Sequence, residues 1–265
     1  MNETLISDPQ LVAKAAKQFE EEPKVEIVTK APSDTEVTLP GGFVNREGAL
    51  VKYAEVRELN GADEEAIARA GTTGRALNTM LQRGLVSIGM ETASKEDLDT
   101  LLSGDRDAIL IGIRKATFGK TIEFQGACTE CSAEQALILD LDKDIPITTL
   151  ENPVEDRMWE YESKLGTVIV GLPTGLTQRR LLENSDKNSA ELNTILLAGC
   201  IASINGSPSI GATSVLKLSW KDRDVLVQQI LERNPGPRLG EVKKACEACG
   251  EDILMPLTLA ALFRV

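Results

Sequence analysis

Four of the five cysteines form two Cys-x-x-Cys pairs that lie far apart in the chain. The first pair is Cys128 and Cys131, and the second is Cys246 and Cys249, with Gly250 directly after it. Four thiolates on two tight turns can complete a tetrahedral metal shell, and four cysteines are a common ligand set of structural zinc sites. Because 118 residues separate the two pairs, one ion held by both would join distant parts of the chain.

We interpret these four cysteines as the ligands of one structural zinc ion, because protein sulfur would fill all four positions. Two alternatives are unpaired structural cysteines and a thiol oxidoreductase. The thioredoxin-like motif begins a helix in a βαβ unit, whereas both pairs here are expected between strands. The fifth cysteine, Cys200, stands in the apolar run at residues 196–202 and is predicted to be a buried, inert thiol.

The elements expected to position the cysteines are two β-hairpins. Strands are predicted at residues 121–124 and 135–141, with the first pair between them. A helix from Gly104 to Phe118 precedes this hairpin. Further upstream, the pattern predicts strands at residues 35–39 and 49–57 joined by a Pro-Gly-Gly turn, a helix opening at residues 60–65, and a second helix at residues 76–88. This mixture predicts the α+β class.

Short sequence matches recur in order along the chain, with offsets that grow from 114 to 118 residues. Residues 77–81 match residues 192–196, the Asp-Arg-Asp at 105–107 matches that at 222–224, and the cysteine pairs follow. The chain is therefore predicted to be two tandem related halves. Their ranges are an arm at residues 1–34, a first half at 35–145 and a second half at 153–265. Each half would supply one hairpin and two thiolates, so that one zinc ribbon joins them.

Three other features of the sequence carry predictions, and two of them have two interpretations. The Asp-Arg-Asp tripeptides could bind a cation or act as acid and base, but we predict helix caps with an arginine that forms ion pairs. Trp159 and Trp220 are predicted to anchor packing. The arm, with a short helix at residues 11–19 and a strand at 24–30, is either a solvated segment or a segment that orders on a partner.

The composition of the chain disfavours several classes of function. The formal net charge is −12, which opposes binding to a phosphate backbone or an anionic membrane surface. The sequence contains no histidine, so the commonest general base is missing. No apolar run reaches the ~18 residues of a membrane span, and the first residues lack the pattern of a signal peptide. We therefore expect no catalysis and no nucleic-acid, membrane or small-molecule ligand.

The order of these motifs carries a resemblance to a known family. The Leu-Pro-Gly-Gly turn precedes a strand and the run at residues 56–65, the Gly-Asp-Arg-Asp helix ends at residues 114–119, and residues 122–124 lead into the cysteine hairpin. This order resembles the baseplate hub and assembly protein family of contractile-tailed, T-even-like bacteriophages, with a four-cysteine zinc ribbon. The resemblance covers residues 35–145 and reaches the second half through its Asp-Arg-Asp and its last cysteine pair.

The resemblance implies a structural subunit of a bacteriophage tail baseplate, zinc-stabilised and non-catalytic, that docks neighbouring tail proteins. It would be made in the host cytoplasm and reside in the virion tail baseplate. Expected partners are other tail and baseplate proteins and copies of the chain itself in a symmetric assembly. The alternatives are an assembly chaperone absent from the mature virion and a zinc-ribbon nucleic-acid-binding protein, which the acidic residues beside the cysteines (Glu130, Glu247, Glu251) disfavour.

Overall fold

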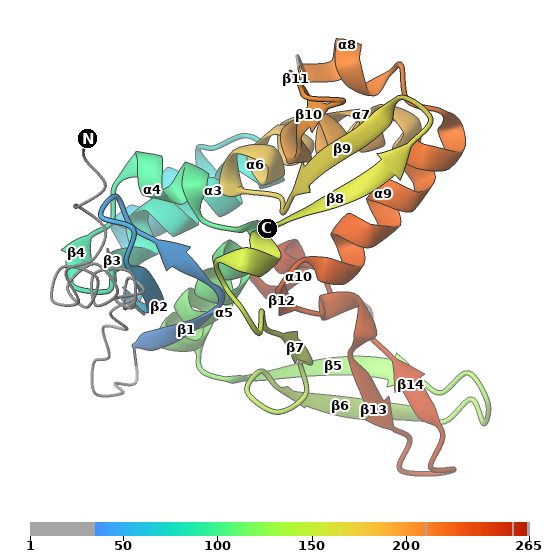
Figure 1. Cartoon of the computed structure of the whole chain (residues 1–265). Helices are drawn as coiled ribbons and strands as arrows, with labels where there is room; N and C mark the ends of the chain where they lie inside the picture. The colour runs from blue at the N-terminus through green and yellow to red at the C-terminus, as the bar shows by residue number, and fades with distance from the viewer. Residues whose placement is uncertain (1–34, 210, 256, 264–265) are drawn as a thin grey trace, which may run out of the picture.

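The computed structural model describes residues 35–209, 211–255 and 257–263 (Figure 1). The predicted helix at 11–19 and strand at 24–30 lie outside these residues. Within them, helices and several antiparallel sheets combine, and the predicted α+β class is confirmed.

The first part of the fold is a four-stranded antiparallel sheet of order β1-β2-β3-β4 covered by helices, from which a long hairpin projects. The longest of these helices, α5, packs against β1 and β2 on one side and against α3 on another. The elements are β1 (Glu36–Val44), β2 (Leu50–Val56), α2 (Gly61–Ala68), α3 (Thr73–Gly84), β3 (Leu85–Ile88), β4 (Glu91–Thr92), α4 (Lys95–Thr100), α5 (Ser103–Phe118), β5 (Thr121–Ala127) and β6 (Glu134–Asp140).

The second part repeats this order of elements. Its sheet has the strand order β8-β9-β10-β11, and a second cysteine hairpin ends it. The elements are β8 (Met158–Ser163), β9 (Gly166–Gly171), α6 (Gly175–Glu183), α7 (Ser189–Cys200), β10 (Ile201–Ile204), β11 (Ser207–Pro208), α8 (Gly211–Val215), α9 (Trp220–Arg233), β13 (Lys243–Ala245) and β14 (Asp252–Leu254).

Short elements connect the two parts and close the chain. Strand β7 pairs with β12, which lies against α5. The short elements are β7 (Ile147–Thr148), η1 (Glu155–Arg157), β12 (Gly236–Pro237), η2 (Leu239–Glu241) and α10 (Leu259–Phe263).

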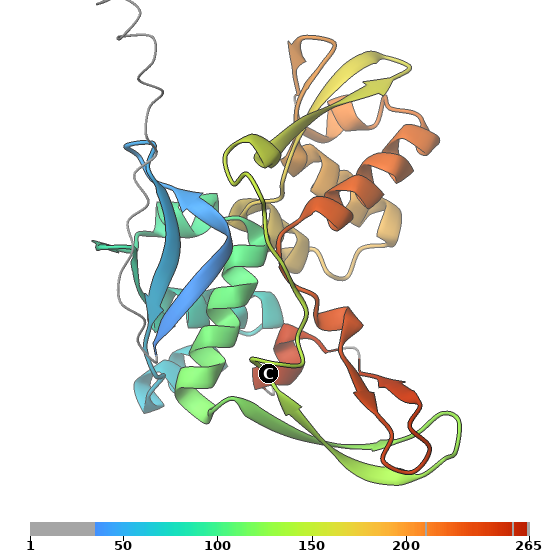
Figure 2. The same cartoon turned by 60° about the horizontal axis from the view of Figure 1, so that its bottom comes forward.

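Two hydrophobic clusters, with no described residue in common, stabilise the fold. We call them the first core, built on the sheet β1–β4 with α3 and α5, and the second core, built on β9, α7 and α9. The C-terminal segment does not join the second core. Instead Val242, Ile253, Leu257 and Phe263 are buried in the first core, and Figure 2 shows β13 and β14 beside the hairpin β5–β6. The end of the chain thus crosses back to the first part.

Local sequence explains most of the helix boundaries. Asn60 accepts hydrogen bonds from the N–H groups of Ala62 and Asp63, and the Asp63 carboxylate accepts one from the Asn60 N–H in return. This capping box begins α2 where the sequence predicted a helix. Helix α5 ends at Phe118, as the sequence also predicted, and the next residue, Gly119, has a positive φ of 81°.

Two predicted boundaries are wrong. The Pro-Gly-Gly segment at residues 40–42 lies inside β1 and not in a turn, and the pairing register of β1 with β2 shifts there. Proline and the shift are tolerated because β1 is an edge strand of its sheet. The second helix ends at Gly84 and not at Ile88, because the aliphatic run Leu-Val-Ser-Ile pairs with β2 as β3.

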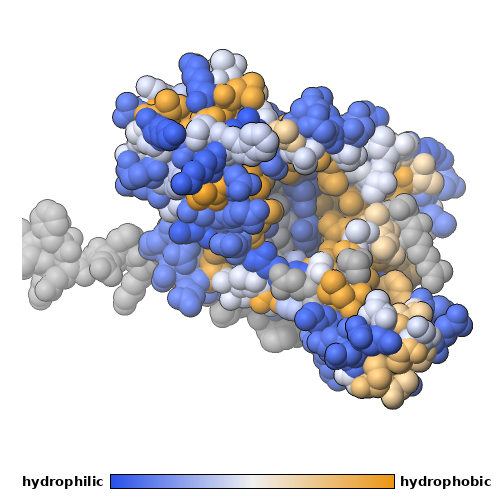
Figure 3. All heavy atoms as spheres, turned by 90° about the vertical axis from the view of Figure 1, so that its right-hand side faces the viewer, coloured by the Kyte–Doolittle hydropathy of each residue, from blue (hydrophilic) through white to orange (hydrophobic). Residues whose placement is uncertain are grey.

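The surface combines hydrophilic and hydrophobic areas. On the side that lies to the right in Figure 1, hydrophobic residues gather around a central hollow, and hydrophilic residues cover much of the rest (Figure 3). Among the described residues, no helix combines the length and the apolar character that crossing a membrane requires.

Candidate metal centre

The first cysteine pair lies in the turn of a regular hairpin. Strands β5 and β6 pair without a shift from Thr121 opposite Asp140 to Ala127 opposite Glu134. In the turn, the Cys128 N–H donates to the Ala133 carbonyl at 3.0 Å. The Ser132 N–H then donates back to the Cys128 carbonyl at 2.9 Å. We call this turn, residues 128–133, the first knuckle.

The second cysteine pair lies in a turn with the same hydrogen bonds. The Cys246 N–H donates to the Glu251 carbonyl at 2.8 Å, and the Gly250 N–H donates to the Cys246 carbonyl at 2.8 Å. Residues 246–251 form the second knuckle. Both knuckles need a positive φ at their fifth position, which is 78° at Gly250 and 58° at Ser132. The two knuckles are therefore alike in backbone, although only the second has glycine at the position with positive φ.

The fold brings all four predicted cysteines together. Their Sγ atoms lie within 4.8 Å of one another. Two contacts cross between the hairpins: Cys128 Sγ is 3.7 Å from Cys249 Sγ, and Cys131 Sγ is 3.7 Å from Cys246 Sγ. A tetrahedron of sulfurs about 2.3 Å from a central zinc has edges of about 3.8 Å. The spacing fits a metal ion at the centre of the cluster, and the soft thiolate set suits zinc or iron.

Polar contacts outside the sulfur cluster also join the two hairpins. The backbone N–H of Glu247 donates to the Gln135 side chain on β6 at 3.0 Å. The Lys244 ammonium lies 2.7 Å from the Asp144 carboxylate in the segment after β6. Cys128 and Cys246 are buried in the first core, while Cys131 and Cys249 are exposed. One side of the cluster is therefore packed in protein and the other faces solvent.

Thiol acidity differs within the cluster. The backbone N–H of Glu251 lowers the pKa of the Cys249 thiol, but hydrogen bonds with the neighbouring thiols, first that of Cys131, outweigh it and raise this pKa to about 12. Hydrogen bonding from the backbone N–H of Cys249 lowers the pKa of the Cys246 thiol to about 6, which favours the thiolate that binds metal. Burial raises the pKa of Cys200 to about 12. Cys200 lies in the second core, so it is the buried thiol that the sequence predicted.

The two Asp-Arg-Asp tripeptides occupy corresponding helix starts but differ in their contacts. Ser219 is the N-cap of α9, and its hydroxyl accepts the Asp222 N–H at 3.2 Å. The Asp222 carboxylate accepts hydrogen bonds from the Ser219 hydroxyl at 2.7 Å and from the Tyr161 hydroxyl at 3.0 Å, so Asp222 supports the cap but is not the capping residue that the sequence predicted. Asp105 instead accepts the Gly41 N–H at 2.7 Å. The prediction of a cap is wrong for Asp105, because the carboxylate reaches across to β1.

The arginines of these tripeptides also depart from the prediction of ion pairs. Arg106 donates to the Leu98 carbonyl at 2.7 Å and to the Asn78 side chain at 3.2 Å. Arg223 donates to the Ala190 carbonyl and to the Thr194 hydroxyl. Arg106 thus joins α5 to α3 and α4, and Arg223 joins α9 to α7. The structure gives these side chains packing roles, and sequence reasoning missed them because both partners are distant in the chain.

Comparison with known proteins gives one match. A protein-family model described as T4 bacteriophage base plate protein matches residues 24–250. The match includes both four-stranded sheets and all four clustered cysteines. The searches of curated proteins and of solved structures returned no match.

Proposed function

The chain belongs to the T4 bacteriophage base plate protein family, and from this premise we propose that it is a zinc-stabilised, non-catalytic structural subunit of the tail baseplate. Membership implies a location in the virion tail and association with other tail proteins. The hollow with hydrophobic residues around it in Figure 3 suits the docking of such neighbours. Synthesis would take place in the host cytoplasm.

The observation that carries the zinc proposal is the four-sulfur cluster. One Zn²⁺ bound by Cys128, Cys131, Cys246 and Cys249 would leave no open position for a substrate, which is typical of structural sites. The ion would supply folding free energy and no chemistry. Since each hairpin offers two thiolates, the metal would link the C-terminal hairpin to the hairpin β5–β6 and so hold the end of the chain against the first core.

We further propose that residues 35–145 and 153–265 are duplicated halves. Support comes from the repeated order of elements, the matching strand order of the two sheets and the shared hydrogen bonds of the two knuckles. In this arrangement the second half returns its hairpin to the core of the first, and neither half can complete the metal site alone.

Metal analysis of the purified protein tests whether one zinc ion is bound by the cysteines of both knuckles. We expect one zinc per chain, and we expect Cys128→Ser and Cys249→Ser to lose the metal and to lower the melting temperature by similar amounts. Cys200→Ala is the control that should keep the zinc. Iron in place of zinc would change the identity of the proposed ion but not the site. Full metal content in either knuckle variant would refute a site shared by both knuckles.

Mass spectrometry of purified virions and baseplate precursors tests the structural role. A subunit should be present in mature particles in fixed proportion to other baseplate proteins. Presence in precursors with absence from mature particles would favour the alternative of an assembly chaperone. Retention on DNA that salt weakens would favour a nucleic-acid-binding ribbon, which the acidic knuckle residues oppose.

A further inference from the structure

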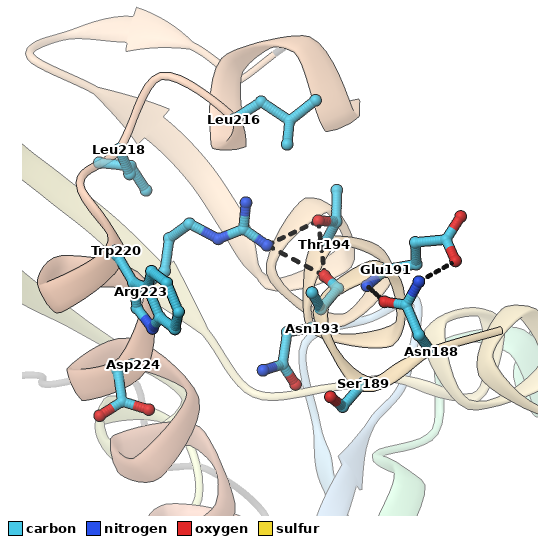
Figure 4. A pocket seen from close by; sticks show the side chains of 11 residues that line it. Asn188, Ser189, Glu191, Asn193, Thr194, Leu216, Leu218, Trp220, Arg223 and Asp224 are labelled. Atoms are coloured by element: carbon cyan, nitrogen blue, oxygen red, sulfur yellow. Dashed lines mark hydrogen bonds between the residues drawn. The ribbon is translucent and has the colours of Figure 1, made fainter.

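A groove of about 600 Å³ lies between the start of α7, the segment after α8 and the first turn of α9. We call it the second groove, because it lies in the second part of the fold. In Figure 4, Arg223 extends from α9 toward α7, where it donates to the Thr194 hydroxyl at 2.6 Å. Trp220 and Leu216 line the groove and are 88% and 61% exposed. The prediction that Trp220 anchors packing is therefore wrong within the described part of the chain.

The corresponding surface of the first part is filled. There α6 lies against α3, α4 and α5. The Gln178 amide donates to Asp107 at 2.6 Å, and Arg179 lies 2.9 Å from Asp99. The Gly175 N–H donates to the Leu101 carbonyl at 2.8 Å. We call the surface that α6 covers the first groove.

The two grooves are built from matching positions of the proposed halves. The offset between paired positions is 116 residues between α3 and α7, whose bounds match, and 117 residues from α4 onward. Arg106 and Arg223 hold the same place in both, because Arg106 bonds Asn78 on α3 and Arg223 bonds the corresponding Thr194 on α7. The pairs are Gly74 with Ala190, Asn78 with Thr194, Asp99 with Leu216, Ser103 with Trp220, Arg106 with Arg223, and Asp107 with Asp224. The second groove is thus the same surface without its helix.

The helix that corresponds to α6 is α2, and one face of α2 is uncovered. The residues of α6 that meet the first groove correspond, at an offset of 114, to Gly61, Glu64, Glu65 and Ala68. All four are exposed, whereas Asp63 and Ile67 on the other side are buried. The chain therefore carries an open groove and an uncovered helix face. They correspond to the first groove and to the face of α6 that covers it.

We propose that α2 of one copy docks in the second groove of another copy, so that the protein assembles head to tail. The repeat supports this occupant, because α6 fills the first groove and α2 is its counterpart in the first part. The charged residues that line the second groove are Arg223, Glu191 and Asp224, so charge does not favour the two carboxylates of the α2 face, and the apolar Leu216 and Trp220 would supply the affinity. Trp220, at the place of Ser103, would be the main anchor, since tryptophan is enriched among residues that dominate binding.

This contact uses different surfaces on the two copies. Every complex therefore keeps one free groove and one free helix face, and growth continues until a ring closes or a filament forms. A closed dimer is not expected. The proposal rests on the duplication of the halves and does not depend on a location in the baseplate.

Sedimentation velocity of the full chain over a range of concentrations tests the proposal. The wild type should form a series of species larger than dimers. Trp220→Ala in the groove and Ala68→Arg on α2 should each weaken association at least about 30-fold, the effect of losing an interface hot spot. Met90→Ala truncates another exposed apolar residue, 76% exposed, and Gln82→Arg adds an arginine at another exposed helix position. Both controls should associate like the wild type.

Mixing the two variants provides the decisive observation. The Trp220→Ala copy keeps an intact α2 face, and the Ala68→Arg copy keeps an intact groove. Their mixture should form a one-to-one dimer that grows no further, because both remaining surfaces are defective. A wild type that stays monomeric at ~100 μM, well above the micromolar range of ordinary interfaces, would overturn the proposal. So would association unchanged by Trp220→Ala, or a mixture of folded variants that stays monomeric.

Discussion

At the scale of single residues, the two knuckles differ where the backbone demands a positive φ. Ser132 adopts a φ of 58° that side chains with a Cβ disfavour, whereas Gly250 adopts 78° at the same position. We therefore expect Ser132→Gly to raise the free energy of unfolding by about 0.5–1 kcal/mol. Urea unfolding of the metal-loaded protein would measure it.

The reverse change at the second knuckle provides the matched comparison. A Cβ on Gly250 would meet no described atom within 4 Å, so Gly250→Ala should cost about 1 kcal/mol through backbone strain alone. Gly240 is equally open but has no positive φ, and Gly240→Ala should be close to neutral. Equal effects at Gly240 and Gly250 would contradict the strain argument.

Asp105 and Asp222 hold matching positions, but their pKa values are shifted in opposite directions. Burial raises the pKa of Asp105 to about 7, despite the Gly41 N–H and the nearby Arg157. Between pH 4 and 7 the folded state keeps a proton that the unfolded state has lost, so this group lowers stability as pH rises. Asp105→Asn removes that slope, at most about 1.4 kcal/mol per pH unit. The variant should gain stability relative to wild type from pH 5 to pH 8.

Asp222→Asn should show the opposite sign. Hydrogen bonds from the Ser219 hydroxyl and then the Tyr161 hydroxyl lower the pKa of Asp222. Its stabilisation is present above pH 4 and is lost as pH falls through the folded-state pKa. This variant should be about 1–2 kcal/mol less stable than wild type at pH 8, with a smaller deficit near pH 4. Chemical unfolding of both variants at three pH values would show whether the signs differ.

At the scale of elements, the fit of α6 in the first groove depends on Gly175. A Cβ at that position would collide with the Leu98 carbonyl oxygen and the Arg106 guanidinium. We expect Gly175→Ala to cost at least about 2 kcal/mol, since the carbonyl belongs to the backbone of α4 and cannot move aside cheaply. The control is Gly61→Ala on α2, where no described atom lies within 4 Å. Thermal unfolding should show a large loss for the first and little change for the second.

The elements that the sequence predicted well are those with local signals. The capping residues of α2, the glycine after α5 and the strands around the first cysteine pair all act through near neighbours. The errors at Gly41 and at Ile88 come from partners distant in sequence, Asp105 and β2. The exposure of Trp220 was also unpredictable, because its helix start resembles that of α5 and only the position of α6 distinguishes them.

At the scale of the whole molecule, the four-cysteine cluster belongs to one core and not to the other. Cys128 and Cys246 are buried among first-core residues, together with Val242 and Ile253. The second core contains β9, α7 and α9 residues and, among the described residues, shares none with the first. Local opening can therefore proceed separately in the two regions.

Removal of the metal should loosen the first core selectively. We expect a chelator to accelerate amide hydrogen exchange in β5, β6, β13, β14 and α10, because the thiolates lose their common ligand and the C-terminal segment is held by fewer contacts. Protection in β9, α7 and α9 should persist. Exchange measured by mass spectrometry would resolve these segments, and equal loss of protection in both cores would contradict the separation.

Cys200→Ser provides the complementary experiment, because it perturbs the second core instead of the first. It places a hydroxyl at a site that is 4% exposed in the second core, which should cost about 1–3 kcal/mol. Exchange should then accelerate in β9, α7 and α9 while the four-cysteine cluster keeps its metal. If each perturbation stays in its own core, the metal acts as a clasp between the chain end and the first core. If the Cys200 variant releases the metal, the contacts of α6 with the first groove or those of β12 with α5 transmit the change.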